Sequence, residues 1–365
     1  MRLVFLTWRD STHPDGGGSE IFVEEVAREL VARGHEVTIR CARHPGSAPA
    51  EDLDGVRLVR RGGRLTVYPR ALAWLATRGR RYDVVVDVIN GLPFGAPLVR
   101  RHGVVALIHH THERQWQIIY PDVRGRIGWA IEHRLTPRLY RGLPHLTVSD
   151  ASRADLVGIG VPESSISVVR NGVRVVPATA ARSATPRLVV LTRLVPHKQV
   201  EDAFHVLARL RDELPDLRLD VVGEGWWRPH LEEALRELRL EDWVTLHGHV
   251  PDDVRDRILA EAWVMLLPSV KEGWGLAIME AAAQGTPTIA YGSAGGVRES
   301  ILDGETGLLV DDRDGLTEAT RSLLVDAGLR DRLGRAARER ARTFSWSSAA
   351  DVVEDVAAGA SAQSP

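Results

Sequence analysis

The sequence predicts an α/β protein built from two doubly wound domains. Short apolar runs alternate with amphipathic stretches along the whole 365-residue chain, as they do in the βαβ units of parallel sheets. The chain is also longer than one hydrophobic core supports, which favours two domains. Residues 176–186 are mostly small, include two prolines and lack apolar periodicity, so we interpret them as the linker.

The first domain is expected to cover residues 1–178. Its first apolar run leads into an amphipathic helix over Ser19–Arg33, which Gly34 ends. The expected strands are Arg2–Trp8, Glu36–Cys41, Val56–Val59, Asp83–Ile89, Val104–Ile108, His145–Val148 and Ser167–Val169. Open α/β sheets bind ligands beyond the carboxyl ends of their strands, so the residues after each strand are the candidates for function.

The second domain is expected over residues 179–344, where the strand pattern begins again. Its expected strands are Arg187–Leu191, Arg218–Val222, Val244–His247, Trp263–Leu267, Pro287–Ala290 and Gly307–Val310. If the carboxyl ends of both sheets face each other, a ligand site lies in a central cleft between the domains.

Composition points to a cytoplasmic protein. The single cysteine, Cys41, excludes an internal disulfide framework and suits a reducing compartment. The first 25 residues do not have the pattern of a signal peptide, and no run of about 18 apolar residues is present, so we expect no membrane span.

Charge is divided unevenly along the chain. Residues 1–178 contain 25 arginines against 18 Asp and Glu, whereas the remainder contains 22 basic and 31 acidic residues. The basic half favours an anionic partner, such as a phosphorylated compound or a membrane surface, or else is a solvated arginine-rich surface. The acidic half argues against a nucleic acid partner.

Residues 57–81 are the most basic candidate surface. Val67, Ala71, Trp74 and Leu75 fall on one side of a helical pattern that is rich in arginine. A helix packed on the sheet with an arginine-rich outer face is the favoured interpretation. The alternative is peripheral docking on an anionic membrane at its inner face.

A glycine-rich turn follows the first strand. Gly16, Gly17 and Gly18 lead directly into the helix that carries Glu20. Three glycines allow close backbone approach, and a helix N-terminus presents free N–H groups, so this turn could hold a phosphate or diphosphate. It matches neither the dinucleotide fingerprint nor the P-loop, and a plain tight turn is the alternative.

Histidines follow the strand that ends at Ile108. His109, His110 and His112 lie within four positions, but adjacent side chains diverge and no second ligand cluster occurs, so we expect no metal site. A histidine at the carboxyl end of a strand could instead bind or polarise a substrate hydroxyl. A satisfied, partly buried histidine is the alternative for at least two of the three.

Only two lysines occur among 47 basic residues, and both lie in candidate site segments. Lys198 and Arg193 follow the first strand of the second domain and could neutralise a diphosphate leaving group. The next strand ends in a further glycine turn at Gly223. Lysine is a point charge on a flexible stem and arginine a rigid fork, so the choice of lysine is informative at a tight site.

The most informative motif begins at the second lysine, Lys271. It places Glu272 in a turn and Glu280 on the helix expected over Leu276–Gln284, about 12 Å apart along the helical rise. This spacing suits contacts with two parts of one extended ligand, and carboxylates bind sugar hydroxyls well. The alternative is two solvated glutamates that flank a structural turn.

These motifs resemble the retaining glycosyltransferases of family 4, over nearly the whole chain. The resemblance rests on the Glu272-x7-Glu280 motif inside Lys-Glu-Gly-Trp-Gly-Leu, on the downstream Gly-Thr-Pro and on residues 304–310. It implies the GT-B fold, in which two Rossmann-like domains face a central cleft. The first domain would hold the acceptor, the second the nucleotide sugar, and a helix over residues 345–360 would cross back to the first.

The resemblance also assigns residues of the first domain. Gly17 and Gly18 would offer amides to the donor diphosphate. His109 would be the active-site histidine, with His110 as the other candidate.

In the second domain, the resemblance implies that Arg193 and Lys198 bind the diphosphate and that Glu272 contacts hydroxyls of the transferred sugar. Glu280 would bind the ribose. The other candidate substrate-binding residues are Gly223, Gly273, Trp274, Gly275 and Leu276. Many relatives have phenylalanine at the position of Trp274.

The implied reaction is transfer of a hexosyl group from a nucleoside diphosphate sugar, of the UDP or GDP type, to an acceptor hydroxyl with retained configuration. The acceptor class stays open among glycans, lipid-linked and small molecules. Neither a metal nor a resident cofactor is expected, and the Asp52-x-Asp54 and Asp312-x-Asp314 pairs are discounted as metal motifs. The alternatives are a non-catalytic nucleotide-sugar binding protein and a GT-B epimerase or phosphorylase.

Overall fold

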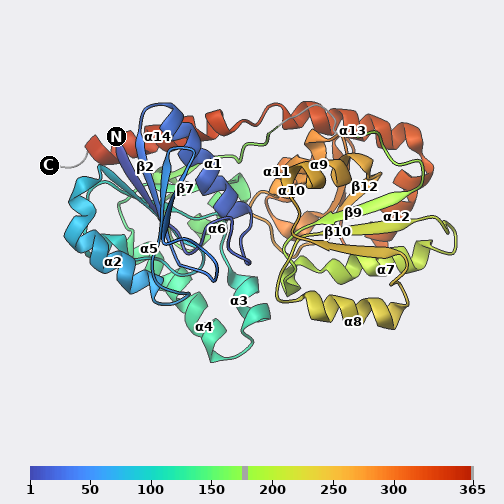
Figure 1. Ribbon diagram of the computed structural model, residues 1–365, viewed down its shortest axis with the longest axis horizontal. Helices are drawn as coiled ribbons and strands as arrows, with labels where there is room; N and C mark the ends of the chain where they lie inside the picture. Colours follow the sequence, from blue (N-terminus) through green and yellow to red (C-terminus); the bar gives the residue numbers. More distant parts are fainter. Residues whose placement is uncertain (175–179, 363–365) are drawn as a thin grey trace. The chain divides into compact units, whose positions relative to one another are not determined.

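The computed structural model of the chain describes residues 1–174 and 180–362, and it contains two α/β units (Figure 1). One compact unit is Met1–Gly172 together with Trp346–Pro365, and the other is Val173–Ser345. Below they are called unit 1 and unit 2. The expected class of two doubly wound, Rossmann-like domains is confirmed.

Unit 1 is built around an eight-stranded, mostly parallel sheet. The strand order is β3-β4-β2-β1-β5-β6-β7-β8, and only β3 runs antiparallel to its neighbour. The strands are β1 (Arg2–Leu6), β2 (Glu36–Cys41), β3 (Ala50–Leu53), β4 (Val56–Arg60), β5 (Val84–Val88), β6 (Val104–Leu107), β7 (His145–Thr147) and β8 (Ile166–Val168).

Helices cover both faces of this sheet. They are α1 (Gly18–Ala32), α2 (Val67–Arg78), α3 (Glu113–Ile119), α4 (Val123–Ala130), α5 (Thr136–Leu139), α6 (Asp150–Gly158) and α14 (Trp346–Ala362). The C-terminal α14 lies beside α1, although their sequences are far apart (Figure 1). On α2, Val67, Ala71 and Leu75 are buried against the strands, so this helix packs on the sheet, as the favoured interpretation expected.

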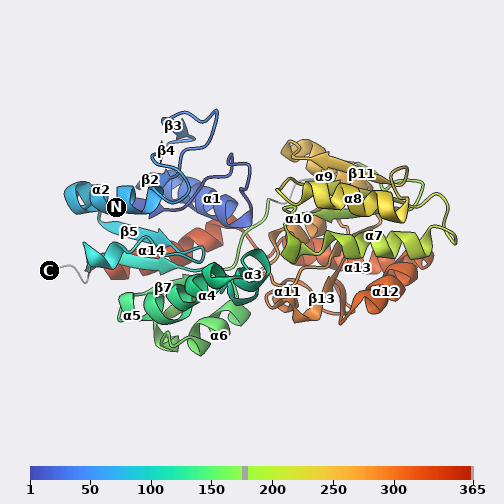
Figure 2. The same cartoon turned by 90° about the horizontal axis from the view of Figure 1, so that it is seen from below.

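The strand β3 was not anticipated. It forms an antiparallel hairpin with β4 at the edge of the sheet, where Figure 2 shows it. Its sequence, Ala-Glu-Asp-Leu, has three exposed residues and no apolar alternation, so nothing in it predicts a strand. β3 is a strand because its backbone forms hydrogen bonds with β4, and its own sequence does not predict this pairing.

Unit 2 contains a six-stranded parallel sheet in the order β11-β10-β9-β12-β13-β14. Its strands are β9 (Arg187–Leu191), β10 (Arg218–Val222), β11 (Val244–Gly248), β12 (Val264–Leu267), β13 (Thr288–Tyr291) and β14 (Gly307–Val310). Its helices are α7 (Val200–Leu210), α8 (Arg228–Leu238), α9 (Asp252–Glu261), α10 (Leu276–Ala283), α11 (Val297–Ser300), α12 (Arg313–Val325) and α13 (Ala327–Ala341).

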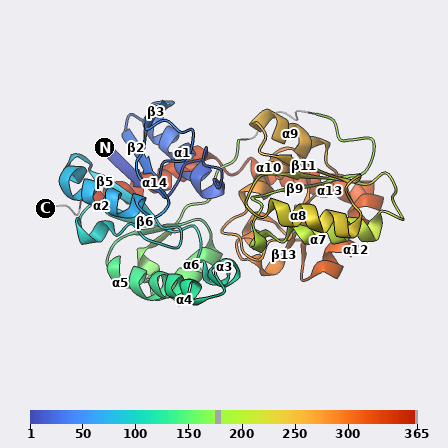
Figure 3. The same cartoon turned by 60° about the horizontal axis from the view of Figure 1, so that its bottom comes forward.

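The core of unit 2 lies between this sheet and the helices that cover it. Phe204 of α7 and Leu231 of α8 pack with the strands in one buried cluster. The two helices lie side by side in Figures 2 and 3. The strand boundaries of unit 2 agree with the sequence-based expectation to within one residue, because buried parallel strands are continuous apolar runs. In unit 1 the first strand ends at Leu6, two residues before the expected end at Trp8.

The predicted linker lies partly outside the described residues, which omit 175–179. Its described part is held by unit 2. Arg182 Nη2 donates to the carbonyl of Gly285 at 2.9 Å, and Trp263 Nε1 donates to the carbonyl of Ser183 at 2.8 Å. From residue 182 onward the segment is therefore fixed to unit 2, and it does not behave as a free connection.

Candidate active site

The sheet of unit 2 has a topological switch point between β9 and β12. The chain passes from β9 outward to β10 and β11, then returns to place β12 on the other side of β9. Two neighbouring strands whose connections leave in opposite directions open a crevice at their carboxyl ends, which is where ligands bind in such sheets. Lys198 follows β9 and Glu272 follows β12.

Lys198 and Glu272 meet at this point. The Lys198 Nζ donates to Glu272 Oε1 at 2.6 Å, and each side chain is 12% exposed. A charge-assisted hydrogen bond of this kind is stronger than a neutral one, and limited water access strengthens it further. The sequence predicted both residues as site residues, and the structure brings them together.

The turn that carries Glu272 is held by a second loop. Glu272 N–H donates to the carbonyl of Ala294 at 2.7 Å, and Gly296 N–H donates to the carbonyl of Glu272 at 3.1 Å. Gly275, at the start of α10, has a φ of +91°, which favours glycine. The turn is therefore fixed at both ends before any ligand binds.

Trp274 fills the space beneath this turn. Its side chain is 2% exposed and packs edge-to-face on Phe344 with ring centroids 5.1 Å apart. A buried aromatic pair of this geometry contributes about 0.5–1.5 kcal/mol beyond its buried area. The tryptophan that departs from the family pattern therefore has a packing role, and its indole supports the turn from within.

Gly296→Ala is expected to disturb this turn directly. A Cβ at Gly296 would lie 1.9 Å from the carbonyl oxygen of Gly273, and backbone cannot move away cheaply. Overpacking predicts a loss of about 1–3 kcal/mol in the free energy of unfolding. Urea unfolding measures it, with Gly328→Ala as the control, because a Cβ there meets nothing closer than 3.4 Å. Equal stability of the two variants would contradict this account.

Arg193 and Gly223 lie on the adjoining loops. Arg193 follows β9 and is half-buried, while Gly223 follows β10 with a φ of +129°. A Cβ at Gly223 would lie 1.9 Å from the carbonyl oxygen of Thr192, so the two loops touch through backbone alone. The segments that carry Arg193, Gly223 and Lys198 thus share one edge of the sheet.

Glu280 has a partner that the sequence did not reveal. Arg255 of α9 lies 3.0 Å from the Glu280 carboxylate, and it also contacts Asp252 and Asp256. Burial raises the pKa of Glu280, and the Arg255 guanidinium lowers it in part. The sequence around Arg255 alternates in charge, and no local signal in it singles Arg255 out.

In unit 1 the glycine turn begins α1. Gly17 N–H donates to Glu20 Oε2 at 2.8 Å, and Ser19 Oγ donates to the same carboxylate at 2.8 Å. Arg9 lies 3.0 Å from Glu20. The Gly17 amide, which the resemblance assigned to a diphosphate, thus has an acceptor within the first turn of its own helix. Gly18 is the first residue of α1.

His109 lies directly beyond β6 and is 6% exposed. Its ring packs edge-to-face on Phe22 at 5.2 Å between centroids, and neither ring nitrogen has a hydrogen-bond partner among the described residues. Burial lowers the pKa of His109 to about 4, against a raising effect of Glu20. The imidazole is therefore neutral at pH 7 and has two unused nitrogens.

His110 and His112 differ from His109 in their surroundings. His110 is half-buried and lies 4.5 Å from the His112 ring, and His112 Nδ1 lies 3.0 Å from Glu132. Among the described residues no group of three His, Cys, Asp or Glu side chains could hold a metal ion.

Protonation of His109 is expected to destabilise the fold in acid. The pKa of His109 is about 4 in the folded state, against 6.5 for an unperturbed histidine. The neutral ring therefore contributes to the free energy of unfolding above pH 6.5, and this contribution is lost as the pH falls toward 4. This difference in pKa between the folded and unfolded states corresponds to about 3 kcal/mol of unfolding free energy. Urea unfolding of the wild type and His109→Gln at pH 7 and pH 4.5 tests this. The two proteins should differ in pH slope between these values, and parallel slopes would contradict the burial argument.

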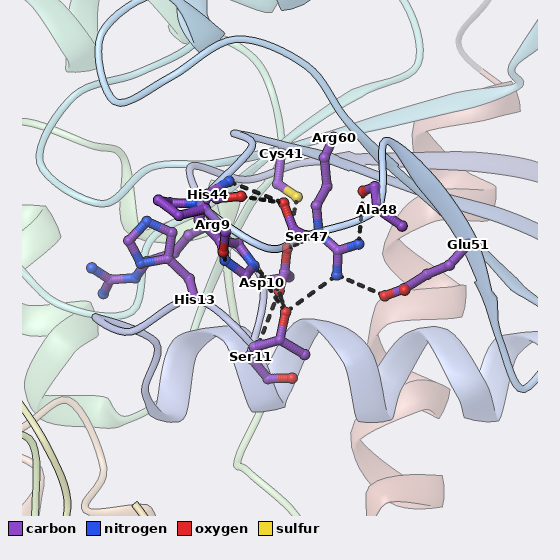
Figure 4. Close-up of polar contacts among 12 residues, drawn as sticks. Arg9, Asp10, Ser11, His13, Cys41, His44, Ser47, Ala48, Glu51 and Arg60 are labelled. Carbon is purple, nitrogen blue, oxygen red and sulfur yellow. Dashed lines mark hydrogen bonds and ion pairs between the residues drawn. The ribbon is translucent and has the colours of Figure 1, made fainter.

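The loop after β1 is organised by a buried carboxylate (Figure 4). Asp10 Oδ2 accepts from Arg60 Nε at 2.6 Å and from Cys41 Sγ at 3.2 Å. Arg60 Nη2 also donates to Glu51 at 2.7 Å, and that glutamate lies on the unanticipated strand β3. Burial raises the pKa of Asp10, but hydrogen bonds, Arg60 first, outweigh it and hold the pKa at about 2.

The two Asp-x-Asp pairs have local backbone roles. Asp52 accepts from the amide of Gly55 at 2.8 Å, and Asp312 caps α12 by accepting from the amide of Gly315 at 2.8 Å.

No helix in the described part of the chain combines the length and apolar character that crossing a membrane requires.

Two doubly wound units, with charged residues at the carboxyl edge of the second sheet, match the architecture expected of the GT-B class. The family profile "Glycosyltransferase Family 4" matches residues 16–176, and "Glycosyl transferases group 1" matches residues 177–340. The chain belongs to glycosyltransferase family 4, and it is an enzyme of glycosyl transfer.

Named relatives extend over the whole chain. It is 30% identical to the MMP alpha-(1->4)-mannosyltransferase of Mycolicibacterium hassiacum, covering 96% of each protein. It is 29% identical to the glycogen synthase of Mycobacterium tuberculosis, over 98% of this chain and 94% of that protein. The solved sucrose-phosphate synthase of Thermosynechococcus elongatus has a TM-score of 0.84 at 21% identity, covering all of both chains.

Proposed function

We propose that the protein transfers a hexosyl group from a nucleoside diphosphate sugar to an acceptor hydroxyl with retained configuration, and that unit 2 binds the donor. The observation that carries the proposal is the Lys198–Glu272 ion pair at the switch point of the unit 2 sheet. A lysine there supplies positive charge for a diphosphate, and the carboxylate beside it accepts hydrogen bonds from sugar hydroxyls.

The leaving group explains the basic residues of this edge. As the bond between the sugar C1 and the phosphate oxygen breaks, negative charge grows on the diphosphate, and we assign Lys198 and Arg193 to stabilise it. Each contribution is about 3–4 kcal/mol, the size found for fixed donors at a developing charge. Lys198 has three N–H donors and gives one to Glu272, so two can reach phosphate oxygens.

Retention follows from attack on the face that the diphosphate leaves. The acceptor oxygen forms its bond to C1 as the phosphate bond breaks, and the acceptor proton passes to the departing phosphate oxygen. Glu272 and the amides of Gly273, Trp274, Gly275 and Leu276 would position the transferred sugar. We assign Glu280 to the ribose, with Arg255 holding its carboxylate in place. Gly223 lets the loop after β10 lie close to the donor.

In unit 1 we assign the acceptor side of the reaction. His109 is the active-site histidine in this proposal, since its ring is neutral, buried and has two nitrogens without partners among the described residues. A buried imidazole without a partner is costly, and a substrate hydroxyl can supply the missing hydrogen bond. His110 is assigned to substrate contacts at the same edge. The Gly18 amide, at the N-terminus of α1, is assigned to the donor diphosphate.

A screen of donors tests this function. Each of the UDP, GDP and ADP forms of glucose and mannose is added to the protein, and the melting temperature and the release of nucleoside diphosphate are measured. A donor at 100 times its dissociation constant adds about 2.7 kcal/mol to the stability of the folded state. If none of these nucleotides raises the melting temperature, the proposal is wrong.

Further readouts separate the rival activities. Product NMR reports the anomeric configuration, and turnover without inorganic phosphate excludes a phosphorylase. A binding protein without turnover would be stabilised by the donor but release no nucleoside diphosphate. Turnover that survives treatment with a chelator supports catalysis without a metal. Cytoplasmic location with peripheral membrane contact is the proposed setting, and vesicle binding, described below, tests the contact.

A further inference from the structure

A pocket lies in unit 1, and His109 is not among the residues that line it. It is enclosed by α2, by the face of β2 and β4 beneath it, and by residues 81–82 that precede β5, and its volume is about 450 Å³. Figure 1 shows α2 in light blue, beside the strands of unit 1. None of the residues that line the pocket belongs to the glycine turn at Gly16–Gly18, so the pocket is separate from that turn.

The pocket is lined by arginines. They come from β2, from β4 and the residue that follows it, from α2 and from the segment after α2. They are Arg40, Arg57, Arg61, Arg70, Arg78 and Arg81. The lining contains no aspartate or glutamate. Within the described residues no carboxylate lies within 4.0 Å of any of these six guanidinium groups, although ion pairs to arginine are frequent elsewhere in the chain.

The strand β4 provides an internal comparison. Side chains alternate between the two faces of a strand, so Arg57 and Arg61 face the pocket while Arg60 faces the other side. On its own side Arg60 is paired with Asp10 and Glu51. Arg60 therefore has two carboxylate partners within 4.0 Å. On the other face Asp52 is the residue opposite Arg57 in the hairpin, but no carboxylate of the described residues lies within that distance of Arg57 or Arg61.

Arg40 is one of the residues that line the pocket, and it is 8% exposed. Its guanidinium stacks over the Trp74 ring at 4.6 Å, and Trp74 in turn contacts Tyr82. Burial lowers the pKa of Arg40, and Arg61 and Arg78 lower it further. Arginine stays ionised in proteins, so this buried charge is held by an aromatic ring, and no carboxylate in the described part of the chain lies within 4.0 Å of it.

We propose that this pocket binds a multiply charged phosphate group, independently of the donor site. Guanidinium forks match phosphate oxygens in a bidentate manner, and six of them around one cavity provide far more donors than a single carboxylate could use. An anion would also relieve the mutual repulsion of the arginines. The volume lies within the range of small-molecule sites, so a phosphorylated metabolite or a lipid headgroup fits the same chemistry.

Titration with inorganic pyrophosphate, followed by calorimetry, tests the proposal. The experiment uses the full chain with Lys198→Ala as background, so that binding at the donor site is weakened. Arg57→Ala/Arg78→Ala should weaken pyrophosphate binding at least about tenfold, because two charged donors are lost. The control is Arg101→Ala/Arg126→Ala, which removes two exposed arginines of the same unit and leaves the pocket intact.

The two sources of phosphate are separated with vesicles. Phosphatidylcholine vesicles with and without phosphatidic acid are sedimented with the wild type and with both double variants. Binding that requires phosphatidic acid and Arg57 with Arg78 identifies a lipid headgroup, whereas pyrophosphate binding without vesicle binding identifies a soluble ligand. Equal pyrophosphate affinity of the two double variants, or no measurable binding by either, overturns the proposal. Unchanged melting temperatures confirm that the variants fold.

Discussion

Replacing Lys198 with alanine is expected to lower kcat by about 10²–10³-fold, the effect of removing one fixed donor at a developing charge. Two changes act together in this variant. The ammonium that faces the leaving group is lost, and the Glu272 carboxylate, 12% exposed, loses its partner at 2.6 Å. Initial rates with saturating donor give kcat, and KM for the donor should change less, because the charge grows mainly in the transition state.

Matched variants separate catalysis from simple loss of an ion pair. Arg321→Ala removes a surface pair with Glu213 in the same unit, at a side chain 30% exposed, and kcat should stay within a factor of two or so of the wild type. Glu272→Gln and the double variant with Lys198→Ala complete a cycle, and strongly non-additive losses are expected for groups that act together. An unchanged kcat in Lys198→Ala would remove the central argument of the proposed function.

Much of the fold could be predicted from the sequence because its strands are buried parallel strands. Runs such as Arg187–Leu191 and Gly307–Val310 are marked by their own composition, and the residues that follow them define the carboxyl edge. β3 could not be predicted, since its sequence is charged and its stability comes from pairing with β4. Local patterns report burial, and this edge strand is exposed.

The candidate site was predictable as a set of residues but not as a set of contacts. Lys198 and Glu272 were noticed through a rare residue type and a family motif, yet their pairing joins positions 74 residues apart. Arg255 and Arg60 were indistinguishable from the other arginines, because what separates them is a buried carboxylate partner supplied by the fold. Charge pairing across a sheet or between helices has no local sequence signature.

Replacing Arg60 with methionine is expected to cost about 3–5 kcal/mol of unfolding free energy, the usual loss when one partner of a buried ion pair is removed. The Arg60 side chain is 1% exposed and that of Asp10 is fully buried, so water cannot replace the lost contact. Without Arg60, burial raises the pKa of Asp10 with fewer opposing hydrogen bonds. Urea unfolding at pH 7 measures the loss, and Arg57→Met on the same strand should change stability by less than about 0.5 kcal/mol.

The pH dependence identifies Asp10 as the origin of this loss. In the wild type its pKa of about 2 is below the ordinary aspartate value of 3.8, so its stabilising effect is present above pH 3.8 and is lost as the pH falls through 2. In Arg60→Met the raised pKa makes the carboxylate costly at neutral pH, and that cost disappears on protonation. The difference in unfolding free energy between the wild type and Arg60→Met should therefore be smaller at pH 4 than at pH 7. Adding Asp10→Asn to Arg60→Met should recover stability at pH 7. If this difference in unfolding free energy stays constant with pH, the instability comes from lost packing of the arginine stem and not from the unpaired Asp10 carboxylate.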